Sequence, residues 1–387
     1  MTNLQKYTIS QILRTSSWWM AIGVLYFMER GVTIQEFFIL SSVFSLCMVI
    51  LEFPTGVIAD KFSHKKSVII GSSISILSQL AFSVPADFYF YLGAFIVASL
   101  GATMKSGSDI AVLHKISNNF EKDLARIKTI NFIWIFFTTL VGGWLYTIDI
   151  RIPYTLTALT TFVSVLFFVK IKVDSNNKLN RGSNIYQVAR KSIKLLGNHE
   201  RLRGVILLSG GFTAFFFSYK WFLPMLFEAK GISIIHLSTV LAIGILMIAL
   251  GTALSGSKYY LRLKYSIPVL LLLIFALGFT GGFWSLTIVT LGIYLLRGFF
   301  TNRMTVLVNK YAKDSIRASV MSLKSLITRV FMAIYMLMVG KILGIWSFEV
   351  LSVVTFAILS IFVLYFVWTV VTSNSQNLKV ARRRRVK

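Results

Sequence analysis

The chain has 387 residues, of which 56% are hydrophobic and 14% are charged, whereas a soluble domain carries about 25% charged residues. This deficit excludes a soluble globular class, and the apolar residues fall in unbroken runs of about 20, the length of a membrane-spanning helix. The net charge of +26 collects between the runs, which indicates a topology signal rather than nucleic-acid binding.

The first half of the chain is predicted to hold six spans. The runs do not alternate polar and apolar residues, so they favour helices over a transmembrane barrel. The first run lacks an A-x-A-like cleavage site, so we expect it to be retained as a span. The fourth span begins near Phe88 and needs about 20 residues to cross, which places Lys105 inside it. The six spans are expected at residues 10–28, 36–58, 67–84, 88 onward, 127–146 and 153–169.

The longest polar segment follows, at residues 170–203. Its apolar residues lie on one face of a helix, with basic residues elsewhere, which predicts an amphipathic helix on the membrane surface. A solvated linker is the alternative. The apolar positions are Ile185, Val188, Ala189, Ile193 and Leu196.

The second half is also predicted to hold six spans. Residues 267–300 would form a helix about 50 Å long, well beyond a hydrocarbon core of about 30 Å. This run must therefore break, and Gly281-Gly282 is the expected place. Its second part then continues to about Val308 and carries Arg297 and Arg303 into the membrane. The remaining spans are expected at 204–226, 235–256, 317–339 and 348–371.

The sequence thus predicts an all-α membrane protein of twelve spans in two six-helix bundles. The first bundle covers 1–169, the cytoplasmic linker 170–203, the second bundle 204–372 and a basic cytoplasmic tail 373–387. With both termini in the cytoplasm, 30 Lys and Arg residues, Arg14 among them, lie on the cytoplasmic side and four lie outside. Six are expected within the spans, namely Lys105, Lys220, Arg297, Arg303, Lys324 and Arg329.

A short basic hairpin joins the second and third spans. It resembles the cytoplasmic loop signature of the major facilitator superfamily, G-x-x-x-D-[RK]-x-G-[RK]-[RK]. The matching residues are Gly56, Asp60, Lys61, Lys65 and Lys66, and we expect His64 at the position of the second glycine. The lead-in Glu52-Phe53-Pro54-Thr55 and the opening of the eleventh span at Arg317-Ala318-Ser319 are similar to bacterial members.

This resemblance implies a two-bundle transporter in which Asp60 helps to hold the outward-open state. The chain departs from the pattern of the family and of its proton-driven drug exporters at three places. Val141-Gly142-Gly143 has no proline in the fifth span, and Ser255 stands where the repeat of the hairpin would have aspartate. The usual arginine of the fourth span is absent unless Lys105 replaces it. The sequence therefore favours the family but not the drug-exporter subgroup.

Charges inside the membrane are costly and are therefore functional candidates. Arg297 and Arg329 are expected near the midplane, about 15 Å from the cytoplasmic face. Because no carboxylate falls at that depth, they favour a substrate with a carboxylate or phosphate. The alternative is that both arginines cap carbonyls or pair with tyrosines. Lys105, Trp134 and Tyr26 complete the expected substrate-binding residues, although packing is the commoner role of such aromatic residues.

Glu52 and Lys324 are expected at one depth and would form an ion pair that latches the two halves. Alternatively, Glu52 carries a proton. Lys105 and Asp109 are four residues apart, which favours a local pair. Lys61, Lys65 and Lys66 are expected to act in gating or to bind anionic lipid. The expected gating residues are Glu52, Gly56, Asp60, Lys61, Lys65, Lys66, Arg317 and Lys324.

We expect no cofactor and no metal. Cys47 is a lone cysteine, the four histidines lack ligand spacing, and no G-x-x-x-x-G-K-[ST] phosphate loop occurs. We interpret the chain as a monomeric, non-enzymatic secondary transporter of the bacterial cytoplasmic membrane. It would export a small amphipathic or anionic molecule by alternating access, coupled to a proton or another cation. Uptake is one alternative, and a transporter-shaped receptor or accessory protein that moves nothing is another.

Overall fold

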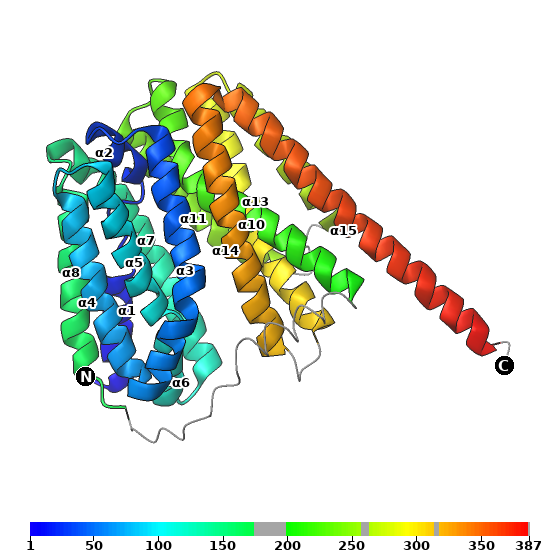
Figure 1. The fold of residues 1–387 in the computed structure, drawn as a ribbon, viewed down its shortest axis with the longest axis horizontal. Coiled ribbons are helices and arrows are strands. Elements are labelled where there is room, and N and C mark those ends of the chain that lie inside the picture. Colours follow the sequence, from blue (N-terminus) through cyan, green and yellow to red (C-terminus); the bar gives the residue numbers. More distant parts are fainter. Residues whose placement is uncertain (174–198, 257–262, 313–316, 386–387) are drawn as a thin grey trace.

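The computed structural model describes residues 1–173, 199–256, 263–312 and 317–385, and no strand occurs in these segments. Figure 1 shows the first half, in blue to green, beside the second half, in green to red. In the first half the helices are α1 (Asn3–Arg14), α2 (Gly23–Glu29), α3 (Ile34–Phe62), α4 (His64–Ser83), α5 (Phe88–Lys105), α6 (Ser108–Ile116), α7 (Phe120–Ile148) and α8 (Ile152–Val169).

The second half follows the same order of long apolar helices. They are α10 (Glu200–Ala229), α11 (Ile234–Gly256), α12 (Leu263–Phe279), α13 (Phe283–Tyr311), α14 (Arg317–Ile345) and α15 (Phe348–Arg385). Ten helical segments in the described part are long and apolar enough to cross a membrane. The shorter α12 and the α1–α2 pair fit the two remaining predicted spans, which gives twelve in all.

The predicted break in the long apolar run is confirmed. Helix α12 ends at Phe279 and α13 begins at Phe283, so Gly281-Gly282 lies between them. Helix α13 then runs on to Tyr311 and carries Arg297 and Arg303, as its length required. The predicted amphipathic helix at 185–196 lies outside the described residues, and α10 begins at Glu200, a few residues before the predicted span.

The first span is not continuous, contrary to the prediction of one helix over 10–28. Helix α1 ends at Arg14, residues 15–22 are not helical, and α2 begins at Gly23. Local hydroxyls compete for the backbone here, because the Thr15 hydroxyl donates to the carbonyls of Gln11 and Ile12. The interruption also depends on a neighbouring helix, because a Cβ at Gly142 of α7 would overlap the Trp18 carbonyl oxygen.

The fourth span is interrupted as well. Helix α5 ends at Lys105 and α6 begins at Ser108, with Gly107 between them at φ +75°. This left-handed conformation suits glycine, which lacks a Cβ. Lys105 therefore lies at the interruption of its span rather than within a continuous helix. Both interruptions belong to the first half of the chain.

The basic hairpin is tighter than the sequence predicted. Helix α3 continues to Phe62 and α4 starts at His64, so Gly56 and Lys61 are helical and one residue makes the turn. That residue is Ser63, with φ +114°, a region that L-residues other than glycine rarely adopt. The placement of the glycine position at His64 was thus wrong by one residue. Ser63 occupies the position that requires a positive φ.

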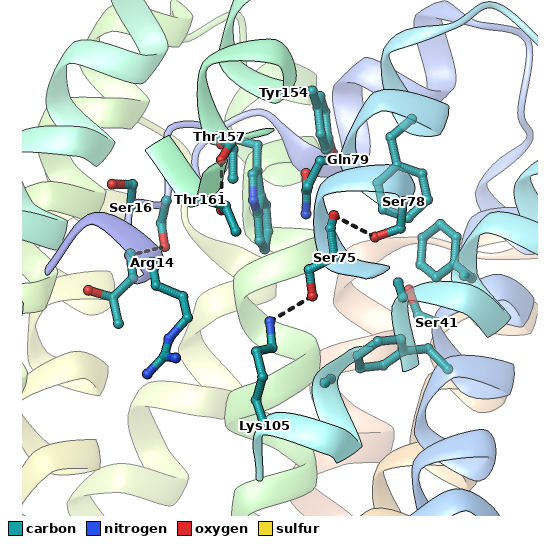
Figure 2. Close-up of a pocket in the computed structure, with 18 of the residues that line it drawn as sticks. Arg14, Ser16, Ser41, Ser75, Ser78, Gln79, Lys105, Tyr154, Thr157 and Thr161 are labelled. Carbon is teal, nitrogen blue, oxygen red and sulfur yellow. Dashed lines mark hydrogen bonds between the residues drawn. The ribbon is translucent and has the colours of Figure 1, made fainter. Parts of the chain in front are cut away.

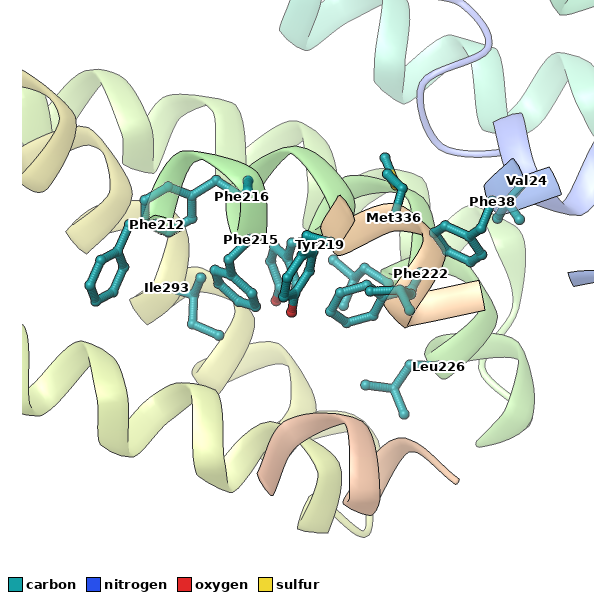
Figure 3. Packing of buried hydrophobic residues seen from close by; sticks show 14 of the residues in the cluster. Val24, Phe38, Phe212, Phe215, Phe216, Tyr219, Phe222, Leu226, Ile293 and Met336 are labelled. Carbon is teal, nitrogen blue, oxygen red and sulfur yellow. The ribbon is translucent and has the colours of Figure 1, made fainter. Parts of the chain in front are cut away.

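The hydrophobic core joins the two halves. Figure 3 shows Phe212, Phe215, Tyr219 and Phe222 along α10, with other buried side chains at one end of the row. Among these are Val24 and Phe38 of the first half and Met336 of α14. Most of α10 is thus buried, whereas α15 leaves Ile361, Leu364 and Trp368 exposed, as a lipid-facing helix would.

The halves are packed tightly at the end of the bundle opposite the linker. There, a Cβ at Gly340 of α14 would come within 2.7 Å of the Phe38 side chain of α3. The hydroxyl of Ser42 donates to the Ala333 carbonyl at 3.0 Å. Toward the linker end, Figure 1 shows α10, α14 and α15 diverging from the first half. The linker end also holds the N-terminus, because Lys6 Nζ donates to the Lys170 carbonyl at 3.3 Å.

Candidate functional site

Two cavities adjoin the interface between the halves. The first, which we call the Arg14 cavity, has a volume of about 470 Å³ and lies mainly within the first half, against α10. Its basic lining residues are Arg14, Lys105 and Lys220, and no Asp or Glu lines it among the described residues. Its apolar wall consists mainly of aromatic residues, including Trp19, Phe44, Phe82, Phe95, Tyr154 and Trp221.

Arg14 enters this cavity from the end of α1. The prediction that it lies in the cytoplasm was wrong, because α1 starts at Asn3 and carries Arg14 about 16 Å along its axis into the bundle. Its side chain is only 6% exposed. Its Nη2 lies 3.7 Å from Oδ2 of Asp109, whereas its Nη1 is buried without a hydrogen-bond partner among the described residues.

Lys105 enters the cavity from the interruption between α5 and α6. Figure 2 shows its side chain and that of Arg14 on two sides of one space. Nζ of Lys105 donates to the Ser75 hydroxyl of α4 at 2.7 Å. The predicted pair between Lys105 and Asp109 is replaced, since Asp109 forms its ion pair with Arg14. The two interrupted helices thus bring two cations together.

The second cavity, which we call the Arg297 cavity, has a volume of about 560 Å³ and lies between α7, α10, α11 and α13. Its basic lining residues are Lys128, Lys220 and Arg297, again with no Asp or Glu among the described lining. The Arg297 guanidinium lies 5.7 Å from the Phe216 ring centroid and 6.0 Å from that of Tyr294. Arg297 thus lines a cavity, as predicted, but does so beside aromatic rings.

Lys220 belongs to both cavities. Its Nζ lies 4.5 Å from the Phe217 centroid, 4.6 Å from that of Trp221 and 5.7 Å from that of Trp19. Trp19 and Trp221 are themselves stacked, with centroids 5.4 Å apart and planes at 7°. These rings offer a cation the negative faces of their π systems in place of water. The sequence placed Lys220 within a span but assigned it no role.

Arg329 and Glu52 form the ion pair that joins α3 to α14. Nη2 of Arg329 lies 3.6 Å from Oε1 of Glu52. The predicted partner of Glu52 was Lys324, five residues before Arg329 on α14, and that prediction was wrong. Glu52 and Arg329 lie nearer the linker end than the Ser42–Ala333 contact on the same two helices. Arg329 therefore belongs to the contact between halves and not to the lining of the two cavities.

Tyr26 and Trp134 are not among the side chains that line the two cavities. Tyr26 is fully buried, and its hydroxyl donates to the Phe82 carbonyl at 2.7 Å. Nε1 of Trp134 donates to the Ser16 hydroxyl at 2.9 Å and so holds the interrupted segment of the first span. Both residues support the fold around the Arg14 cavity, the packing role that was the alternative.

The basic residues of the hairpin lie at the linker end. Nζ of Lys65 donates to the Val169 carbonyl, at the end of α8, at 2.7 Å. Lys61 and Lys66 are exposed, and a Cβ at Gly56 would have no neighbour within 4 Å. The structure describes only the backbone of Asp60 and Arg317, so the roles expected for them stay predictions. The same holds for the lipid contacts expected of the lysines.

The sequence did not identify Arg14, Lys128 or Lys220 as site residues. A signal for Arg14 existed in Arg14-Thr15-Ser16-Ser17, in which three hydroxyl residues follow a cation inside an apolar run. Such residues favour a helix end over a helix interior. Lys128 and Lys220 carried no comparable signal, because their position depends on which face of a helix meets the other half.

The comparisons with known proteins agree with this architecture. The family model of the Major Facilitator Superfamily matches residues 7–306. The chain belongs to the major facilitator superfamily. It is 24% identical over 200 residues to the uncharacterized MFS-type transporter YxaM of Bacillus subtilis strain 168. That match covers 50% of this chain and 50% of YxaM, so the chain spans about half the length of this curated relative.

Solved structures of bacterial and other transporters share the fold. A mutant of the nucleoside transporter NupG superposes with a TM-score of 0.79 at 17% identity, covering 95% of this chain and 98% of that one. A bacterial homolog of the human lysosomal transporter Spinster, in an inward-facing and unoccupied conformation, gives 0.73 at 11% identity, with 95% of each chain covered. These similarities establish the fold.

Proposed function

We propose that this major facilitator protein is a secondary active transporter of small organic anions. The observation that carries the proposal is the lining of the two cavities. Arg14, Lys105, Lys128, Lys220 and Arg297 line them, and no carboxylate does among the described residues. Cations held in a site of low dielectric attract a carboxylate or phosphate and disfavour a cationic substrate. Arg297 keeps its predicted role as a substrate-binding residue.

The contacts between halves support transport by alternating access. The halves meet closely at the end opposite the linker, through Phe38 with Gly340 and Ser42 with Ala333. The excess of Lys and Arg in the linker and neighbouring loops favours a cytoplasmic linker and cytoplasmic termini. On this proposal the structure represents a state closed toward the outside of the bacterial cytoplasmic membrane. Rocking of the halves would then break the outer contacts.

The direction and the driving force belong to the same proposal. We propose export driven by the gradient of a proton or another cation, with uptake as the competing direction. A phosphate loop for ATP hydrolysis is missing from the whole sequence, so an ion gradient is the available energy source. The ion pair of Arg329 and Glu52 would act as a latch between the halves, and making or breaking it would control the path toward the linker end.

Flux into proteoliposomes tests the proposal. The purified protein is reconstituted, a pH or sodium gradient is imposed, and uptake of radiolabelled carboxylates and phosphate esters is compared with that of neutral and cationic analogues. Saturable, gradient-dependent flux of the anions alone is expected. Arg297→Ala should reduce it to the level of empty liposomes at unchanged expression, whereas Lys264→Ala, at an exposed lysine outside both cavities, should not change it.

Unchanged flux in the Arg297→Ala variant would remove Arg297 from the substrate path. Flux of cations in preference to anions would overturn the substrate class. The transporter-shaped receptor is the competing function, and it predicts a stoichiometric bound partner together with no flux of any solute in the panel. Counterflow with the gradient reversed separates export from uptake.

A further inference from the structure

The strongest unexplained feature of the molecule is a set of unsatisfied polar atoms in the Arg14 cavity. Buried polar atoms in proteins nearly always have a hydrogen-bond partner. In this cavity four lining side chains have a buried atom without one among the described residues. The atoms are Nη1 of Arg14, Oγ of Ser41, Oε1 of Gln79 and Nε1 of Trp221.

These four atoms come from different parts of the fold and share one space. Arg14 ends α1, Ser41 lies on α3, Gln79 on α4 and Trp221 on α10. Figure 2 shows Arg14, Ser41 and Gln79 around the same cavity, with the Lys105 ammonium between them. A cavity lined by several unsatisfied polar groups is a site for a polar ligand or for ordered water.

The charge balance favours an anion as that ligand. Arg14, Lys105 and Asp109 together carry one excess positive charge, because Asp109 neutralises only one of the two cations. Lys105 has a neutral partner, the Ser75 hydroxyl. A buried charge without a counter-ion is costly, so one anionic group between Arg14 and Lys105 would balance the cluster. Arg14 Nη1 and the remaining ammonium hydrogens of Lys105 are the donors available to it.

The apolar and neutral polar residues of the cavity would contact the part of the ligand that carries no charge. The opposite wall of the cavity is apolar and includes Phe44, Phe82 and Phe95. The Gln79 amide and the Ser41 hydroxyl also line the cavity and would bond to polar groups on the body of the ligand. A volume of about 470 Å³ accommodates a ligand of one or two rings.

We propose that the Arg14 cavity binds the substrate as a soluble organic acid with one anionic group and an apolar ring body. Arg14 and Lys105, brought together by the interruptions of the first and fourth spans, hold the anionic group. The aromatic wall holds the ring. This inference rests on the proposed transport of anions and adds the orientation and the class of the molecule. It also assigns Arg14 and Lys105 to binding in the state described, and Arg297 to a later position on the path.

Isothermal titration calorimetry of the full-length protein in detergent tests this inference without relying on flux. The probes are 2-naphthoate and 2-naphthamide, which share a shape and differ in charge. The acid is expected to bind at least about tenfold more tightly than the amide, the value of one charge-assisted hydrogen bond of about 1.5 kcal/mol. Lys105→Gln should remove that preference, and Lys264→Gln, the matched change at an exposed lysine, should leave it intact.

Arg14 needs a balanced variant, because Arg14→Gln alone leaves the partly buried Asp109 without its partner. Arg14→Gln combined with Asp109→Asn removes both charges and keeps the volume, and it should also lose the preference for the acid. Equal binding of acid and amide by the wild type overturns the inference, as does an acid preference that survives both variants. Absence of binding by either probe and by phenyl phosphate shows that the cavity holds water only and overturns it too.

Two further results separate this inference from the proposed function and from a lipid ligand. Loss of the acid preference in the Lys105→Gln variant together with no flux in liposomes would retain the site and reject transport. Flux that requires Arg297 but not Arg14 or Lys105 would retain transport and reject the Arg14 cavity as the binding site. Binding of lysophosphatidate with no binding of the ring acids would assign the cavity to a lipid headgroup and overturn the soluble class.

Discussion

The first and second halves of this protein position their buried cations in different ways. In the first half, the first and fourth spans are interrupted, at 15–22 and 106–107, and present Arg14 and Lys105 at the interruptions. In the second half the corresponding helices, α10 and α13, are continuous and carry Lys220 and Arg297 on their faces. Arg14 keeps a buried Nη1 without a partner among the described residues and Lys105 donates to the Ser75 hydroxyl, whereas Lys220 and Arg297 lie beside aromatic rings of α10 and α13.

The cations of the first half are therefore available to bind an anion, whereas those of the second half would have to give up contacts with aromatic rings to do so. A guanidinium that keeps a free N–H beside a cavity is ready to bind an anion. A lysine among three rings is stable without a ligand, so an anion must compete with the rings to attract it. Substitutions in each half test this difference between them.

The largest effect is expected from removing the cation that both cavities share. Lys220→Met keeps the length of the side chain and its contacts with Phe217 and Trp221 but removes the charge. Anion flux in proteoliposomes should fall to the level of empty liposomes. The melting temperature should fall by only a few degrees, because a cation–π contact contributes about 0.5–2 kcal/mol. Retention of more than half the flux would show that Lys220 lies off the substrate path.

One methyl group added to α7 should distort the interrupted segment of the first span. In Gly142→Ala the new Cβ would overlap the Trp18 carbonyl oxygen, so the backbone of the interrupted segment must shift. We expect a loss of about 1–3 kcal/mol of stability, the usual cost of overpacking, together with loss of acid binding. Gly93→Ala is the matched control, because its Cβ has no neighbour within 4 Å. Equal melting temperatures of the two variants, measured by fluorescence-detected size exclusion, would contradict the close approach.

The Arg14–Asp109 ion pair should behave as a unit. Arg14→Gln alone leaves the partly buried Asp109 carboxylate without its ion pair and should cost about 1–3 kcal/mol. Adding Asp109→Asn should restore most of that loss, since no unpaired charge remains. Thermal unfolding of the two single variants and the double variant completes the cycle. Additive losses would show that the two side chains act independently.

The contact between halves at Glu52 and Arg329 should have a smaller effect on stability. The Glu52 side chain is 43% exposed, so its ion pair is screened by solvent and Glu52→Gln should cost at most about 1 kcal/mol. Because the pair joins α3 to α14, the variant should instead change the rate of flux. Crosslinking between the linker ends of these two helices measures the opening. An unchanged flux rate and crosslinking yield would exclude a latch at this pair.

The smallest effect is expected at the turn between α3 and α4. Ser63→Gly relieves a positive φ of +114° but removes the hydrogen bond that the Lys66 N–H donates to the Ser63 hydroxyl at 3.3 Å, so it should stabilise the protein by about 0.5 kcal/mol. Ser73→Gly, within α4 and exposed, should instead destabilise it by about 0.5 kcal/mol, the helix penalty of glycine. A lower melting temperature for Ser63→Gly would contradict the turn geometry.

Much of the fold was predictable because span length and hydropathy are local properties. The break at Gly281-Gly282 followed from the length of one apolar run, and Arg297 followed from the need to complete the next span. The site was less predictable. Arg14 was assigned to the cytoplasmic side because it lies near the N-terminus, which the excess of Lys and Arg places in the cytoplasm. Only the start of α1 at Asn3 shows that the cation lies inside the bundle.

Partners across helices were the least predictable feature. Glu52 was paired with Lys324 by depth alone, whereas the faces of α3 and α14 bring it to Arg329. Asp109 was paired with Lys105 by helical spacing, which fails because Gly107 interrupts the helix between them. Depth and spacing constrain one coordinate of a side chain. The rotation of each helix about its axis sets the others.

The amino-acid sequence alone was enough to predict the protein class, the approximate position of the spans, the uneven distribution of positive charge and the family, because the insertion of a segment into a bilayer depends on its own length and hydropathy. The positions at which helices are interrupted, and the cations that lie close together, became visible only in the tertiary structure. Those features depend on contacts such as Gly142 with Trp18, in which a residue in one helix makes room for the backbone of another.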